Sequence, residues 1–161
     1  IKLFLDKLRK EIGMGDKFGN TILLMVGPFS SFEDLTLNGE IIHIDPDFRS
    51  LDYLILKNGN YYITFDHSFY DELSSQERLF VIAHEVWHAK KYSKANPETI
   101  NPILAQVPME ALRSEVASDF FAAKYVDPEV IRDFLFKYCN NKNELGWRVW
   151  ALFKLQEEKR C

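Results

Sequence analysis

The chain has 161 residues, of which 47% are hydrophobic, and a formal net charge of −4 at pH 7. This length and composition are enough for one buried core, so we expect residues 1–161 to form a single domain. No run of basic residues indicates nucleic-acid binding. The uncharged stretch Thr21–Phe32 is too short and too interrupted by glycine, proline and serine to cross a membrane. Two distant cysteines and the lack of a signal-peptide pattern lead us to expect a cytoplasmic protein.

The first half of the chain predicts one helix followed by short strands. Apolar residues at helical spacing indicate a helix over residues 1–12, which ends at Gly13-Met14-Gly15. An apolar run at 21–26 stops at Gly27-Pro28, and the stretches 39–45, 51–57 and 60–65 are typical of strands. Asn58-Gly59 is a two-residue turn signal between the last two of these. We therefore expect a small antiparallel sheet behind one helix.

The second half predicts helices. Ser74 followed by Glu77 is a capping-box pattern that opens a helix from about 75 to 94. Pro108 suits the first turn of a second helix that runs to about 126, and Asp127-Pro128 opens a third that runs to about 138. The last helix is expected over 143–159, with Trp147, Trp150, Ala151 and Leu155 turned inward. Together the two halves predict an α+β fold.

The first of these helices contains His84-Glu85-Val86-Trp87-His88, an H-E-x-x-H pattern. Histidines four residues apart lie one above the other on a helix, so both imidazoles can bind one Zn²⁺ ion. Apolar residues surround them on nearly every side, and a helix of that kind is buried. Buried histidines and carboxylates are costly unless they are bonded or bound to metal, so we interpret His84 and His88 as ligands and Glu85 as the general base.

The helix after Pro108 offers a third ligand. On a 3.6-residue wheel, Glu115 and Asp119 lie within about 60° of Leu112, on the same arc as Met109, Val116 and Phe120. Arg113, Ser114, Ala117 and Lys124 occupy the other side. Two buried carboxylates that close need a cation or a hydrogen-bond donor. We therefore expect Glu115 to bind the metal and Asp119 to accept the free N–H of a ligand histidine.

This pairing of H-E-x-x-H with a later E-x-x-x-D resembles the gluzincin zinc metallopeptidases, and more closely the ImmA/IrrE family of soluble metallopeptidases. The likeness rests on residues 62–88 and on Glu115–Ala123, read as E-V-A-S-D-F-F-A-A, within about 60–128. It implies a zincin-like domain and a zinc-dependent peptidase that cuts a protein or peptide, specifically a regulatory protein of the cell or of a phage or mobile element. The chain departs from the family at Trp87, where glycine is usual, and at Ala117 and Ser118.

Three further features of the sequence bear on catalysis. Tyr92 and His67 are candidate donors to the carbonyl oxygen of a substrate, although each fits a structural role better, and His43 fits only a structural role. If the strand at 60–65 formed the sheet edge, a substrate could pair with it; otherwise it only closes the hairpin. The loop 95–107 is long enough for a lid or for a simple connection.

Other functions are compatible with the same pattern. A zinc-binding module that no longer catalyses, with Trp87 crowding the cleft, is the main alternative, and a peptidase domain cut from a larger protein is another. Mn²⁺, Fe²⁺ or Co²⁺ could use the same ligands, but Glu85 favours hydrolysis over the oxygen chemistry of two-histidine, one-carboxylate iron sites.

Overall fold

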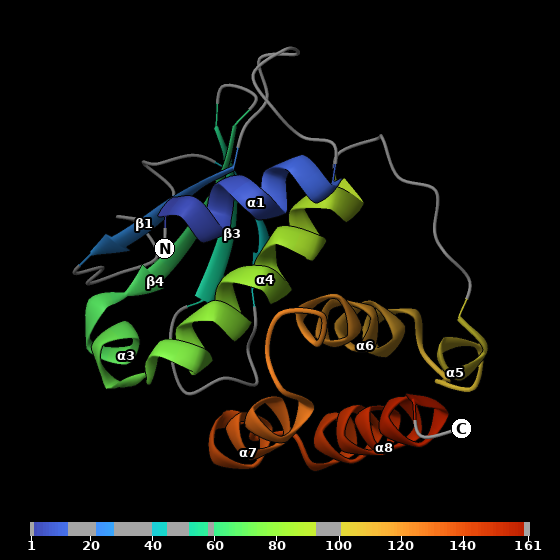
Figure 1. Cartoon of the computed structure of the whole chain (residues 1–161). Coiled ribbons are helices and arrows are strands. Elements are labelled where there is room, and N and C mark those ends of the chain that lie inside the picture. Colours follow the sequence, from blue (N-terminus) through green and yellow to red (C-terminus); the bar gives the residue numbers. More distant parts are fainter. Residues whose placement is uncertain are drawn as a thin grey trace.

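The computed structural model describes residues 2–12, 22–27, 40–44, 52–57, 60–92 and 101–159, which form an α+β fold (Figure 1). The first half contains helix α1 (Lys2–Ile12) and strands β1 (Ile22–Gly27), β2 (Glu40–Ile44), β3 (Asp52–Lys57) and β4 (Asn60–Asp66). The second half contains α3 (His67–Glu72), α4 (Ser75–Tyr92), α5 (Pro102–Ala105), α6 (Glu110–Ala122), α7 (Pro128–Tyr138) and α8 (Lys142–Lys159).

The sheet has the strand order β1-β4-β3-β2. Strands β3 and β4 pair antiparallel with Lys57 opposite Asn60, and β2 pairs antiparallel with β3, whereas β1 runs parallel to β4. The prediction of an antiparallel sheet is therefore correct for these two pairs and wrong for β1, which joins through a parallel pair. The hydrophobic pattern of a strand defines which face is buried but says nothing of the direction in which its neighbour runs. The predicted turn Asn58-Gly59 lies outside the described residues.

Strand β4 is an inner strand, because β1 and β3 flank it. Its burial agrees with this position: Tyr61, Ile63, Thr64 and Phe65 are all buried. The idea that this strand is a free edge for an extended substrate is therefore wrong. Both sides of its backbone are already hydrogen-bonded to neighbouring strands, so no donors or acceptors remain there for a peptide to pair with.

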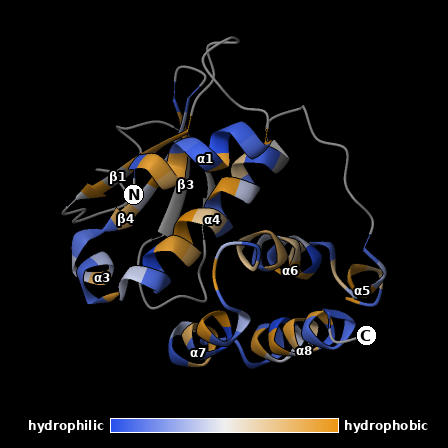
Figure 2. Ribbon diagram, viewed as in Figure 1, coloured by the Kyte–Doolittle hydropathy of each residue, from blue (hydrophilic) through white to orange (hydrophobic). Residues whose placement is uncertain are grey.

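Helix α4 lies at the centre of the described structure. It contacts β3, β4 and α1 on one side and α6 and α7 on the other. Figure 1 shows α1 and α4 in front of the sheet, with α6, α7 and α8 beyond α4. The middle of α4 is fully buried, as its apolar sequence predicted: Phe80, Val81, Ile82, Ala83, Val86 and Ala89. Figure 2 shows the same pattern, with hydrophobic residues along β1 and α4 and a mainly hydrophilic α3.

The ends of the helices confirm several sequence signals. Ser74 N–H donates to Glu77 Oε1 at 2.8 Å and Glu77 N–H donates to Ser74 Oγ at 3.2 Å, which is the reciprocal capping box. The Asp127 side chain accepts from the Glu129 N–H and caps α7. In α1 the buried residues are Leu5, Leu8 and Ile12, at the predicted spacing.

Three features of the helical half differ from the prediction. The short helix α3 follows β4 directly, where the sequence analysis gives no helix, and α5 begins at Pro102 inside the predicted loop 95–107. Pro108 does not lie in the first turn of α6, because Met109 is the N-cap and the helix begins at Glu110. In the described part of the chain, no helix is both long and apolar enough to span a bilayer.

Candidate metal centre

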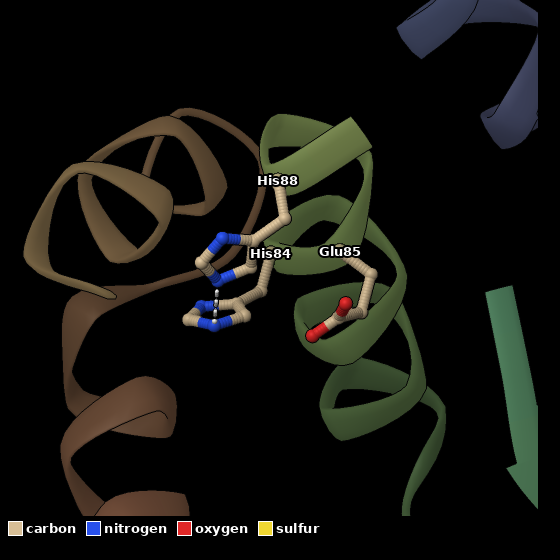
Figure 3. A group of neighbouring side chains, drawn as sticks. All are labelled: His84, Glu85 and His88. Carbon is tan, nitrogen blue, oxygen red and sulfur yellow. Dashed lines mark hydrogen bonds between the residues drawn. The ribbon is translucent and has the colours of Figure 1, made fainter. Parts of the chain in front are cut away.

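His84 and His88 project from neighbouring turns of α4 towards α6 (Figure 3). Each is only 1% exposed, and their Nε2 atoms are 3.1 Å apart. The Phe80 ring packs against the His84 ring with centroids 5.6 Å apart, which adds an apolar wall on the same helix. The four-residue spacing therefore does place both imidazoles at one buried point.

Glu115 on α6 completes a set of three donor groups. Its Oε2 is 2.9 Å from His84 Nε2, and its Oε1 is 3.1 Å from His88 Nε2. Tetrahedral zinc with bonds of about 2.0–2.1 Å separates neighbouring ligand atoms by about 3.3 Å. The three donor groups are thus within a few tenths of an ångström of the spacing that a four-coordinate ion requires, and small rotations would open the site to that size.

Hydrogen bonds to the outer ring nitrogens orient both imidazoles. His84 Nδ1 is 3.0 Å from Asp119 Oδ1, and both residues are completely buried. His88 Nδ1 is 3.5 Å from Ser114 Oγ, a longer contact. With Nδ1–H donating in each case, the two Nε2 atoms are the ones turned towards Glu115. Such outer contacts fix the tautomer and orientation of metal-binding histidines.

Arg148 of α8 is the second charged partner of Asp119. Its Nε donates to Asp119 Oδ2 at 2.8 Å and its Nη2 donates to Asp119 Oδ1 at 2.7 Å. Its Nη1 is 3.6 Å from Glu115 Oε2, and the side chain is 0% exposed. The guanidinium therefore lies beside both carboxylates that α6 contributes to the site.

These contacts shift the pKa values of the site in opposite directions. Burial alone would lower the pKa of His84, but the Glu115 carboxylate and the hydrogen bonds to Asp119 and Glu115 raise it to about 10. Burial lowers the pKa of His88, and the Glu115 carboxylate offsets this only in part. Burial would raise the pKa values of both carboxyls, but the two histidines hold that of Glu115, and Arg148 that of Asp119, below their usual ranges. These shifts favour a positively charged His84 between two ionised carboxylates, beside a neutral His88.

Glu85 is fully buried beside the histidines. It shares with His84 and His88 a group of potential metal-binding atoms that all lie within 4.8 Å of one another. Figure 3 shows its carboxylate at the side of the two imidazoles rather than between them. That placement follows from its offset of about 100° from His84 on the helix, and it suits a base that acts next to a metal ion.

Other residues singled out from the sequence lie elsewhere. His67 begins α3 with a half-exposed side chain 3.9 Å from Asp66, so it is not part of the buried cluster. Tyr92 is the last residue of α4, and its side chain lies outside the described part, as does that of His43. The Trp87 ring packs on Phe121 at 5.1 Å between centroids, and Lys90 lies over it at 4.9 Å.

Two residues of the site are not predicted by the sequence, and one residue outside the site that was predicted to face inward is exposed. The helical wheel places Ser114 on the outer side of α6, and no motif in the sequence indicates Arg148, because a charged residue on a helix is normally exposed. Met109 was expected to face inward and is instead 56% exposed. The only available signal for Arg148 was its position between Trp147 and Trp150 in the most apolar part of α8.

Comparisons of the chain with protein-family models, with curated proteins and with solved structures find no significant match. The interpretation of this cluster therefore rests on the chemistry and geometry of its side chains.

Proposed function

We propose that the protein is a zinc-dependent peptidase in which His84, His88 and Glu115 bind the metal and Glu85 is the general base. The observation that carries the proposal is the convergence of two imidazole nitrogens and one carboxylate within 2.9–3.1 Å of one another. Buried histidines that close to one another need a proton or a metal ion between them. The H-E-x-x-H pattern adds the carboxylate that hydrolysis requires.

The donor set favours zinc. Two imidazoles and one carboxylate, with a fourth position left for water, form the ligand set of catalytic zinc sites, whereas Ca²⁺ and Mg²⁺ prefer oxygen ligands. A zinc ion held there supplies Lewis acidity, which lowers the pKa of water and polarises a carbonyl group. Mn²⁺, Fe²⁺ and Co²⁺ fit the same residues, so the nature of the metal belongs to the proposal.

The residues around the proposed metal have two further roles, orienting the imidazoles and transferring a proton. Asp119 and Ser114 hold the imidazoles in one orientation, and Asp119 also meets Arg148. Glu85 would accept a proton from the attacking water and deliver it to the leaving amine of the peptide. Its burial beside the two imidazoles keeps that proton transfer away from bulk solvent and next to the proposed metal.

The resemblance to ImmA/IrrE metallopeptidases extends the proposal to the fold and the substrate. On that basis we propose a zincin-like arrangement of the domain and, as substrate, one specific regulatory protein of the cytoplasm. The internal position of β4 limits how such a substrate binds, because it cannot extend the sheet at that strand.

The metal site is tested first, by measuring the zinc content of the purified protein. We expect one equivalent in the wild type and less than a tenth of that in a His84→Ala/His88→Ala variant. His67→Ala is the matched control, because this histidine is half-exposed and outside the cluster, and it should retain its zinc. A full equivalent of zinc in the double variant would place the metal elsewhere.

Catalysis is tested with Glu85→Gln, which keeps the shape of the side chain but removes the proton acceptor. Zinc content and melting temperature should remain near wild type, while hydrolysis of a peptide that the wild type demonstrably cuts should fall by at least about 10²-fold. Glu72→Gln, at an exposed glutamate of α3, controls for a general effect of the substitution. Equal cleavage by wild type and Glu85→Gln would refute the mechanism.

Burial favours a second candidate, a zinc-binding module that does not catalyse. His84, His88 and Glu85 are all within 1% of complete burial, which leaves a substrate little access to them. The Trp87 ring contacts Phe121 and Lys90, and its crowding of the cleft stays a prediction from the sequence. Stoichiometric zinc without cleavage of any peptide in a proteome-derived library would favour this candidate, or a peptidase domain that needs the rest of a larger protein.

A further inference from the structure

Arg148 stands out because it is the largest of the fully buried side chains among the described residues. A guanidinium carries five N–H donors and a fixed charge, so its burial is costly unless carboxylates surround it. Here two carboxylates of α6 do so: Asp119 accepts from Nε and Nη2, and Glu115 lies 3.6 Å from Nη1. The two carboxylates that stabilise the buried guanidinium are therefore the same two that face the histidines.

The geometry of the pair fixes the Asp119 carboxylate. Arg148 contacts both of its oxygens, Oδ2 at 2.8 Å and Oδ1 at 2.7 Å. The same Oδ1 lies 3.0 Å from Nδ1 of His84. A carboxylate held at both oxygens by a planar fork cannot rotate, whereas one held by the imidazole alone can. The orientation of the His84 ring is thus determined through Asp119 by a residue on a third helix.

We propose that Arg148 is a positioning residue for the metal centre, which acts through Asp119 to hold His84 in its binding orientation and so sets the affinity for the metal. Arg148 is a cation and does not bind the metal itself. The inference rests on the proposed metal centre. It makes α8 part of that centre, although none of the three proposed ligands belongs to α8.

The test measures zinc affinity by competition with a chromophoric chelator, on the full chain. Arg148→Met removes the charge and the fork but keeps much of the length, and we expect zinc affinity to fall by about 10- to 100-fold, the range typical of partners of metal-binding histidines. Arg148→Lys keeps the charge without the fork, and its zinc affinity should lie between those of the wild type and of Arg148→Met. The d–d absorption spectrum of the Co²⁺-loaded variants should also change, because it reports the ligand geometry.

A double-variant cycle distinguishes positioning from general support of the fold. If Arg148 acts through Asp119, the affinity of Asp119→Asn/Arg148→Met should lie within about threefold of that of Asp119→Asn alone. If the two residues act independently, the two losses should multiply. Multiplied losses would overturn the inference.

The control is Arg132→Met, which removes a half-exposed arginine of α7 that lies outside the site and should leave zinc affinity and the cobalt spectrum unchanged. Each variant is checked for folding by circular dichroism, and if Arg148→Met does not fold, Arg148→Lys decides. Wild-type zinc affinity and an unchanged cobalt spectrum in the folded Arg148 variant would overturn the inference while the metal centre stands. A wild-type protein that binds neither Zn²⁺ nor Co²⁺ would instead refute the metal centre itself.

Discussion

Raising the pH from 6 to 8 should tighten zinc binding about 100-fold, because the metal has to displace one proton from the site. Without metal, the pKa of His84 is about 10: burial opposes this value, but Glu115 and Asp119 together overcome it. The pKa of His88 is lowered and that of Glu115 is well below its usual range, so these two are already in their metal-binding forms. Only His84 has a proton to lose.

The magnitude follows from this single proton. At pH values far below the pKa of His84, the fraction of His84 that is neutral rises tenfold with each pH unit. The apparent zinc affinity should rise by about the same factor per unit. Two units give about 100-fold, or about 2.7 kcal/mol, and each zinc ion should release about one proton.

Two measurements check this reasoning. Chelator competition at pH 6, 7 and 8 gives the slope, and calorimetric titrations in buffers with different ionisation enthalpies give the number of protons released. Asp119→Asn is the matched variant, because it removes one of the carboxylates that hold the proton on His84, and its slope should be shallower. An affinity that does not change with pH, with no protons released, would refute the electrostatic account of the site.

Further predictions concern the framework of the site. Asp119→Asn should keep the fold and weaken zinc binding by about 10- to 100-fold in a competition titration, and an unchanged affinity would make Asp119 purely structural. Because the folded-state pKa of His84 lies above its ordinary 6.5, its stabilising effect is complete below pH 6.5 and is lost as the pH rises towards 10. The melting temperature of the chelator-treated protein should therefore fall between pH 7 and 9, whereas that of the zinc-loaded protein should not. Phe80→Ala, which empties a fully buried position against His84 and Phe134, should cost about 3–5 kcal/mol in denaturant unfolding, and a loss under 1 kcal/mol would contradict the packing described. Ser74→Ala should cost only about 1 kcal/mol, because it removes one hydrogen bond of an exposed cap.

Local signals in the sequence predicted the helix that carries the site. The Ser74–Glu77 capping box sets its start, and the apolar residues around His84 and His88 indicate its burial, because both depend on positions within a few residues. The helical wheel likewise placed Glu115 and Asp119 on the buried side of α6.

What the sequence could not predict depends on contacts between distant elements. The direction of β1 relative to β4 is decided by the path of the chain between them, and no residue pattern within either strand records it. Arg148 is buried only because Asp119 and Glu115 are there to receive it, so its burial can be inferred only after α6 and α8 are placed together.

The parallel pairing of β1 with β4 also constrains the order of folding. Leu24 and its partner Ile63 are 39 positions apart, whereas Lys57 and Asn60 in the hairpin are 3 apart. Short loops close at less entropic cost, so the hairpin should form first and β1 should dock onto it later. During synthesis α1 and β1 are translated before β4, the strand with which β1 pairs. Pulsed hydrogen exchange should find the amides of β1 among the last in the sheet to gain protection.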